Sequence, residues 1–204
     1  MTGLEALLGH PQADHLARSL AERPGATLLA QGEEQRRAAV AVILRAAQGP
    51  EGDLELLMIK RSECDGDPWS GHVALPGGRE EPGDRDLEAT ALRETWEETG
   101  VDIRANGRVL GALDDLGPRS QTLPPLTVRP FVAIVASDVI LAESPEVAEA
   151  FWVPLAELKR PAQWVEATVF VRGEDRIVAS FRHGAHTVWG MTERILRELL
   201  ARLD

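Results

Sequence analysis

The chain has 204 residues, with 33 Asp or Glu against 22 Lys or Arg, so its formal net charge is −11. This length predicts one domain, and a hydrophobic fraction of 44% is ordinary for a globular protein with a buried core. The acidic excess excludes proteins that bind nucleic-acid backbones or anionic membranes through basic patches. Cys64 is the only cysteine, which excludes an internal disulfide and a thiolate zinc cluster.

The beginning of the chain lacks the basic start and the long apolar core of a secretory signal. No apolar run approaches the roughly 18 residues that span a bilayer. We therefore expect a cytoplasmic protein with neither a membrane nor a nucleic acid as a partner.

The first predicted element is helical. Residues 4–22 are rich in helix formers, Pro11 interrupts them, and a Pro-Gly pair follows. We expect residues 1–35 to form a helical extension and residues 36–204 to form a single globular domain.

Strands and helices then follow in an irregular order. Apolar segments at 36–46 and 53–61, joined by a Gly/Pro-rich turn, predict a hairpin. Residues 62–84 predict a loop with a short strand at 72–75, and residues 86–99 predict a helix that Gly100 ends. Strands are predicted at 103–113, 126–136 and 149–153, a hairpin at 168–181 and an amphipathic helix at 191–203. This order predicts an α+β protein, an α/β/α sandwich with a mixed sheet.

Three glutamates share one face of the predicted helix at 86–99. At 100° per residue, Glu97 and Glu98 lie about 60° and 40° to either side of Glu94. Leu92 and Trp96 lie on the opposite face, which we expect to face the core. Like charges this close repel by a few tenths of a kcal/mol per pair, and Mg²⁺, which prefers oxygen ligands, would neutralise them. A solvated acidic face is the alternative.

The pattern around these glutamates resembles the signature of the Nudix hydrolases, Gly-x5-Glu-x7-Arg-Glu-U-x-Glu-Glu-x-Gly-U with U aliphatic. The matching residues are Gly78, Arg93, Glu94, Glu97, Glu98, Gly100 and Val101. Thr95 departs from it at the first aliphatic position. Asp84 takes the first acidic position, and the gap from Gly78 to Arg93 is one residue longer than the general pattern.

This variant of the signature resembles the coenzyme A diphosphatase subgroup of the family. The segments Ala74–Gly78, Thr90–Glu94 and Trp189–Thr192 also resemble that subgroup. The loop at 67–72 departs from it, because it lacks the subgroup's Leu-Arg-x-His-x-Gly segment. The resemblance implies a Nudix fold from about residue 38 onward.

The resemblance also implies roles in holding Mg²⁺ or Mn²⁺. Glu94 and Glu98 would be the principal metal ligands, with Glu97 a further ligand or bound through water. The carbonyl of Gly77 would add a backbone oxygen. Arg93 would orient the carboxylates by charge-assisted hydrogen bonds, with Asp84 as a partner; an ordinary surface ion pair is the alternative.

A diphosphatase also needs a carboxylate that accepts a proton from the attacking water. Glu98 and Glu146 are the candidates, and Glu149 ranks behind them. Substrate contacts are predicted for Arg61, Trp69 and Arg119, of which the arginines would contact phosphates and the tryptophan would stack on a base. A solvated arginine and a loop anchor are the respective alternatives.

The predicted substrate is a nucleoside diphosphate linked to another group, first coenzyme A or its derivatives. ADP-ribose, a nucleotide sugar or a nucleoside triphosphate is the alternative, and a non-catalytic Nudix module that senses a ligand is a further one. The sequence leaves open whether the terminal helices form a homodimer interface.

Overall fold

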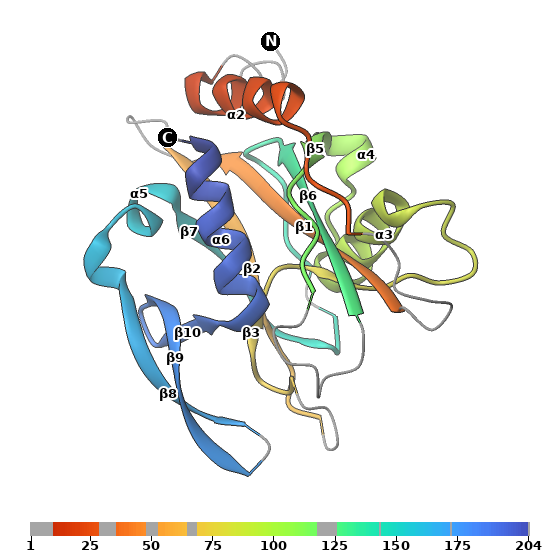
Figure 1. Cartoon of the computed structure of the whole chain (residues 1–204). Helices are drawn as coiled ribbons and strands as arrows, with labels where there is room; N and C mark the ends of the chain where they lie inside the picture. The colour runs from red at the N-terminus through yellow and green to blue at the C-terminus, as the bar shows by residue number, and fades with distance from the viewer. Residues whose placement is uncertain are drawn as a thin grey trace.

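A computed structural model gives the fold. It describes residues 10–28, 36–47, 53–64, 69–117, 126–142, 144–171 and 173–203. The predicted class is confirmed: a mixed β-sheet lies between two layers of helices, as Figure 1 shows. None of the helices in these ranges is long and apolar enough to cross a bilayer.

Among the described residues, the central sheet has seven strands, in the order β3-β2-β1-β6-β5, with β4 on β1 and β7 on β2. Within this part of the chain β1 and β6 are the only parallel pair, and β1 and β2 form the predicted antiparallel hairpin. The strands are β1 (Arg36–Ala46), β2 (Leu54–Arg61), β3 (Val73–Ala74), β4 (Gly77–Arg79), β5 (Gly107–Ala112), β6 (Leu126–Val135) and β7 (Val147–Pro154).

Helices cover both faces of this sheet, and a second sheet lies beside it. The helices are α2 (Pro11–Glu22), α3 (Leu87–Thr99), α4 (Ile103–Asn106), α5 (Leu155–Leu158) and α6 (Gly190–Leu203), with a 3₁₀ turn η1 (Pro161–Gln163). The second sheet holds β8 (Trp164–Val171), β9 (Glu174–His183) and β10 (His186–Trp189), in the order β10-β9-β8.

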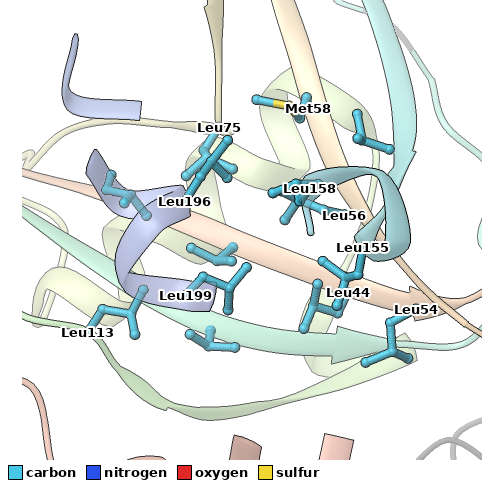
Figure 2. Close-up of a cluster of buried hydrophobic side chains, with 14 of the residues drawn as sticks. Leu44, Leu54, Leu56, Met58, Leu75, Leu113, Leu155, Leu158, Leu196 and Leu199 are labelled. Atoms are coloured by element: carbon cyan, nitrogen blue, oxygen red, sulfur yellow. The ribbon is translucent and has the colours of Figure 1, made fainter. Parts of the chain in front are cut away.

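Successive side chains of β1 point to opposite faces of the sheet, and this alternation explains why the protein has two hydrophobic core clusters. Val42 and Leu44 point into the cluster under α2, α5 and α6, whereas Ala41 and Ile43 point into the cluster under α3 and α4. Figure 2 shows the first cluster, where Leu196 and Leu199 of α6 meet leucines of the sheet. A strand buried on both faces is a continuous apolar run, as residues 38–44 are.

The terminal helices pack against each other within one chain. Leu16 and Leu20 of α2 and Ile195 and Leu199 of α6 are fully buried in the same core cluster. Arg202 of α6, itself 1% exposed, donates to the carbonyl of Arg23 and so holds the end of α2. The apolar faces of both helices are therefore occupied inside the chain.

The predicted start of one strand is wrong. The strand expected at 103–113 begins only at Gly107, because Ile103–Asn106 form the short helix α4. The side chain of Asp102 caps this helix and accepts hydrogen bonds from the amides of Arg104 and Ala105, at 2.9 and 3.1 Å. That local capping outweighs the strand preference of the segment.

Candidate functional site

The helix α3 carries the site, and both of its ends are fixed by local chemistry. The side chain of Asp86 accepts a hydrogen bond from the amide of Ala89 at 2.8 Å and caps the N-terminus. At the C-terminus, Gly100 adopts a left-handed conformation with φ of 70°, as predicted. The two caps fix where α3 begins and ends.

The prediction that Trp96 of α3 faces the core is wrong. Its side chain is 60% exposed, whereas Thr95 and Glu98 are buried. The helix packs small residues on the sheet and turns Glu94 and Glu98 toward β4, so the bulky indole lies on the solvent side. Thr95 stands where the family signature has an aliphatic residue. Its buried hydroxyl is satisfied, because it donates to the carbonyl of Ala91 at 2.7 Å.

Two glycines let the backbone of β4 approach these carboxylates. A Cβ on Gly78 would lie 2.4 Å from Oε1 of Glu94. Gly77 has φ of +150°, and its amide donates to Oε2 of Glu98 at 2.8 Å. The pair Gly77 and Gly78 therefore brings both glutamates against one strand of the sheet.

Arg93 links the loop before α3 to the carboxylates of the helix. Its Nε and Nη2 donate to Asp84 at 3.0 and 2.9 Å, and its Nη1 donates to both Glu94 and Glu97 at 3.0 Å. Nη2 also donates to the carbonyl of Arg79 at 3.1 Å. The bidentate bond from Arg93 holds the pKa of Asp84 well below its usual range, and Asp84 in turn raises the pKa of Arg93.

Burial sets the charge properties of Glu94 and Glu98. Their side chains are 16% and 4% exposed. Burial, which disfavours the charged form, raises the pKa of Glu98 to about 7, and the negative charges of Glu94 and Glu146 add to the effect. The pKa of Glu94 is also raised, mainly by burial. A cation placed between these carboxylates would relieve both effects.

A cleft with a volume of about 520 Å³ opens above these carboxylates. Glu94, Glu98, Glu146 and Arg61 line one part of it, and Nη1 of Arg61 lies 3.9 Å from Oε1 of Glu98. Apolar side chains also line it, among them Ala38, Val40, Leu126, Val128, Met191 and Ile195. The cleft therefore presents both charged and apolar side chains.

The structure places the other candidate residues in different ways. Trp69, 47% exposed, lines the cleft as predicted for a substrate contact. Glu97 does not line it, because its 47%-exposed side chain is held by Arg93 on the outer side of α3. Glu149 lies outside the cleft wall and contacts Nε2 of His186 at 3.4 Å. Arg119 lies outside the described residues.

The sequence did not predict the aromatic wall of the cleft. The rings of His72 and Trp189 meet edge to face, with their centroids 4.9 Å apart, and both residues line the cleft. The carbonyl of His72 accepts a hydrogen bond from the amide of Arg61 at 3.0 Å. Trp189 is 117 residues from His72 in the sequence, and only the packing of β10 beside β3 brings them together. The sole signal was the resemblance of Trp189–Thr192 to the coenzyme A subgroup.

The donor set fits a hard divalent cation. Glu94, Glu98 and Glu146 present only carboxylate oxygens to the cleft, and the glycine backbone lies beside them. Within the described ranges, no three His, Cys, Asp or Glu side chains already converge on one point. Metal binding at these residues would therefore require rotation of side chains. Glu146 is exposed, so its side chain has room to rotate.

Known proteins are similar to this chain in sequence and in fold. The model of the NUDIX domain matches residues 35–172. The uncharacterized Nudix hydrolase NudL of Klebsiella pneumoniae is 32% identical over 191 residues, which is 93% of each chain. An uncharacterized protein of Schizosaccharomyces pombe is 43% identical over 111 residues, which is 52% of this chain but 33% of that longer protein.

The crystal structure of a MutT/nudix family protein from Enterococcus faecalis superposes with a TM-score of 0.58 at 23% identity, over 86% of this chain and 64% of the other. This likeness shows a shared fold. The chain belongs to the Nudix hydrolase family.

Proposed function

We propose that the chain is a divalent-metal-dependent diphosphatase and that its substrate is coenzyme A or a derivative of it. The observation that carries the proposal is the pair of buried glutamates, Glu94 and Glu98, held against Gly77 and Gly78 at the floor of the cleft. Among the described residues, Arg61 and Arg79 are the arginines that line this cleft, and a cation held by the glutamates would add positive charge for a diphosphate.

Each residue has a role in this reaction. Glu94 and Glu98 would hold Mg²⁺ or Mn²⁺, with the Gly77 carbonyl as a backbone ligand, and Arg93 with Asp84 would keep Glu94 in place. When bound, the metal neutralises the diphosphate oxygens and makes a water more acidic. Arg61, whose Nη1 lies 3.9 Å from Oε1 of Glu98, would contact a phosphate beside these carboxylates.

We assign proton acceptance to Glu146. Glu98 is the alternative base, but one of its oxygens accepts from the Gly77 amide and the other faces Arg61. Glu146 is exposed and lines the same cleft, so its carboxylate is accessible to water. Water would attack one phosphorus and form a new P–O bond, while the bond from that phosphorus to the bridging oxygen breaks. The bridging oxygen would leave with the other phosphate, and Glu146 would accept the proton of the water.

The apolar part of the cleft supports coenzyme A over smaller diphosphates. A pantetheine arm is long and mostly uncharged, and the wall of Trp189, Met191 and Ile195 would cover it. Hydrolysis would release 4'-phosphopantetheine and adenosine 3',5'-bisphosphate.

A substrate panel with product identification by mass spectrometry tests the proposal. Coenzyme A, ADP-ribose, a nucleotide sugar and a nucleoside triphosphate are compared at one Mg²⁺ concentration and again with Mn²⁺. We expect coenzyme A to be cleaved with the highest kcat/KM. Turnover of ADP-ribose without turnover of coenzyme A would refute the substrate, and no turnover of any compound with either metal would refute the enzymatic proposal and favour a ligand-sensing module.

A further inference from the structure

The hairpin of β8 and β9 projects from the body of the protein (Figure 1). Its register is unbroken from the pair Trp164–Phe181 at the base to the pair Val171–Glu174 at the tip. At the base Phe181 is fully buried and packs on Trp164, with their ring centroids 5.3 Å apart. The base of the hairpin is therefore anchored in the core of the molecule.

The outer half of the hairpin carries exposed apolar side chains. Phe170 and Ile177 are 71% and 72% exposed. Ile177 faces Thr168 across the ladder, so it lies on the same face as Phe170, two residues away on the diagonal. A two-stranded ribbon that exposes apolar side chains to water is only marginally stable. Pairing with a further strand would therefore stabilise this part of the molecule.

The edge of β8 is suited to strand pairing. In the order β10-β9-β8, no further strand among the described residues lies beside β8. Natural edge strands avoid pairing through Lys, Pro, bulges or short length. β8 has eight residues, contains neither Lys nor Pro, has no bulge against β9, and carries a single charge, at Glu166. The opposite edge, β10, has four residues and lies against β3.

We propose that β8 pairs antiparallel with β8 of a second copy of this chain, about a two-fold axis near Thr168. The two three-stranded sheets then become one six-stranded sheet. Such an interface is isologous, so the same strand serves both copies. Because the β10 edges are short and covered by β3, the assembly closes at two copies.

The charges of β8 permit this register. Pairing about Thr168 sets Glu166 opposite Phe170, and Val165 opposite Val171, of the second copy, so no like charges face each other. Each copy carries a net charge of −11, and copies repel over most of their surface. A strand with one charge in eight residues is therefore a favourable place for two copies to meet.

The size of the contact predicts a weak dimer. An eight-residue strand is roughly 26 Å long and a sheet with its side chains is about 10 Å thick, so the buried area is on the order of 500 Å² in total. Stable interfaces bury about 1,200 Å² or more. We therefore expect association only at high protein concentration.

Analytical ultracentrifugation of the full chain tests the proposal, from about 1 μM to about 500 μM protein. The perturbing variant is Thr168→Asp, which sets two carboxylates opposite each other at the two-fold axis of the proposed dimer. The matched control is Ile177→Asp, which adds the same charge on the same face of the hairpin, one strand further from the proposed interface. Circular dichroism verifies that both variants are folded.

We expect the average mass of the wild type and of Ile177→Asp to rise toward the dimer with concentration, while Thr168→Asp stays monomeric. A monomeric wild type over the whole range would overturn the proposal, as would a Thr168→Asp variant that associates as strongly as Ile177→Asp. Mass rising beyond the dimer would overturn the closed two-fold arrangement. Hydrolase assays on the same samples are independent of this outcome, since neither residue lines the cleft.

Discussion

Replacement of Asp84 by Asn tests whether the loop before α3 is fastened to the helix by Arg93. In the wild type, Arg93 makes two charge-assisted hydrogen bonds to Asp84, at 3.0 and 2.9 Å. The side chains of Asp84 and Arg93 are 7% and 22% exposed. The Asn side chain keeps one acceptor and turns an amide NH₂ toward the guanidinium, so one bond is lost and a donor faces a donor.

The expected loss of stability follows from that geometry. A hydrogen bond to a charged group contributes about 1.5–3 kcal/mol, and partial exposure of Arg93 favours the lower end. We expect Asp84→Asn to reduce the free energy of unfolding by about 2 kcal/mol, which in a chain of this length lowers Tm by roughly 4–8 °C. The affinity for Mg²⁺ should fall about 10–100-fold, because Glu94 loses its positioning.

Urea unfolding in EDTA measures the stability change, and calorimetric titration measures Mg²⁺ binding. Asp86→Asn is the matched control. Asp86 caps α3 from the same loop, and Asn caps helices as well as Asp does, so this variant should lose less than about 0.5 kcal/mol.

The pH dependence has a defined sign. The pKa of Asp84 is lower in the folded state, so its contribution is complete above the unfolded pKa near 4 and is lost as the pH falls below that value. The difference between wild type and Asp84→Asn should therefore shrink below about pH 4. Equal stabilities of the two Asn variants at pH 7 would refute the reasoning.

Three further predictions concern the cleft. Glu98→Gln should abolish hydrolysis. In EDTA, the wild type should lose up to about 3 kcal/mol of stability between about pH 4.5 and 7, because ionisation of a carboxyl with a raised pKa disfavours the folded state. Thermal melts should show that Glu98→Gln lacks this loss. Gly78→Ala should push the Glu94 carboxylate aside and lower kcat/KM about 10–100-fold in steady-state assays. Trp189→Ala should raise KM for coenzyme A about 10-fold with less effect on kcat, while the exposed Trp96→Ala control changes neither.

The sequence predicted what depends on local patterns. The strands of the central sheet follow apolar runs, and α3 follows a capping aspartate and a terminal glycine, so residues close together in the chain determine them. The resemblance to the family signature implies the hydrogen bonds between Arg93 and Asp84, and the structure contains them.

The sequence failed where long-range packing decides the outcome. Helical angles alone could not tell which face of α3 meets the sheet, so Trp96 was assigned to the core. The contact of His72 with Trp189 needs the turn of β9 into β10, and the separation of Glu97 from the cleft needs the position of Arg93. The contact of His72 with Trp189 has no local signature, whereas the ion pair of Arg93 with Glu97 has the i,i+4 spacing of a helix.

The central claim is that Glu94 and Glu98 hold a divalent cation through which an acidic cleft binds an anionic diphosphate. Equilibrium binding of a non-hydrolysable methylene analogue of coenzyme A, with Mg²⁺ and with EDTA, tests it most directly. We predict tight binding to the wild type only with Mg²⁺, and no effect of Mg²⁺ on Glu98→Gln. Equal binding to the wild type in EDTA and in Mg²⁺ would contradict the claim.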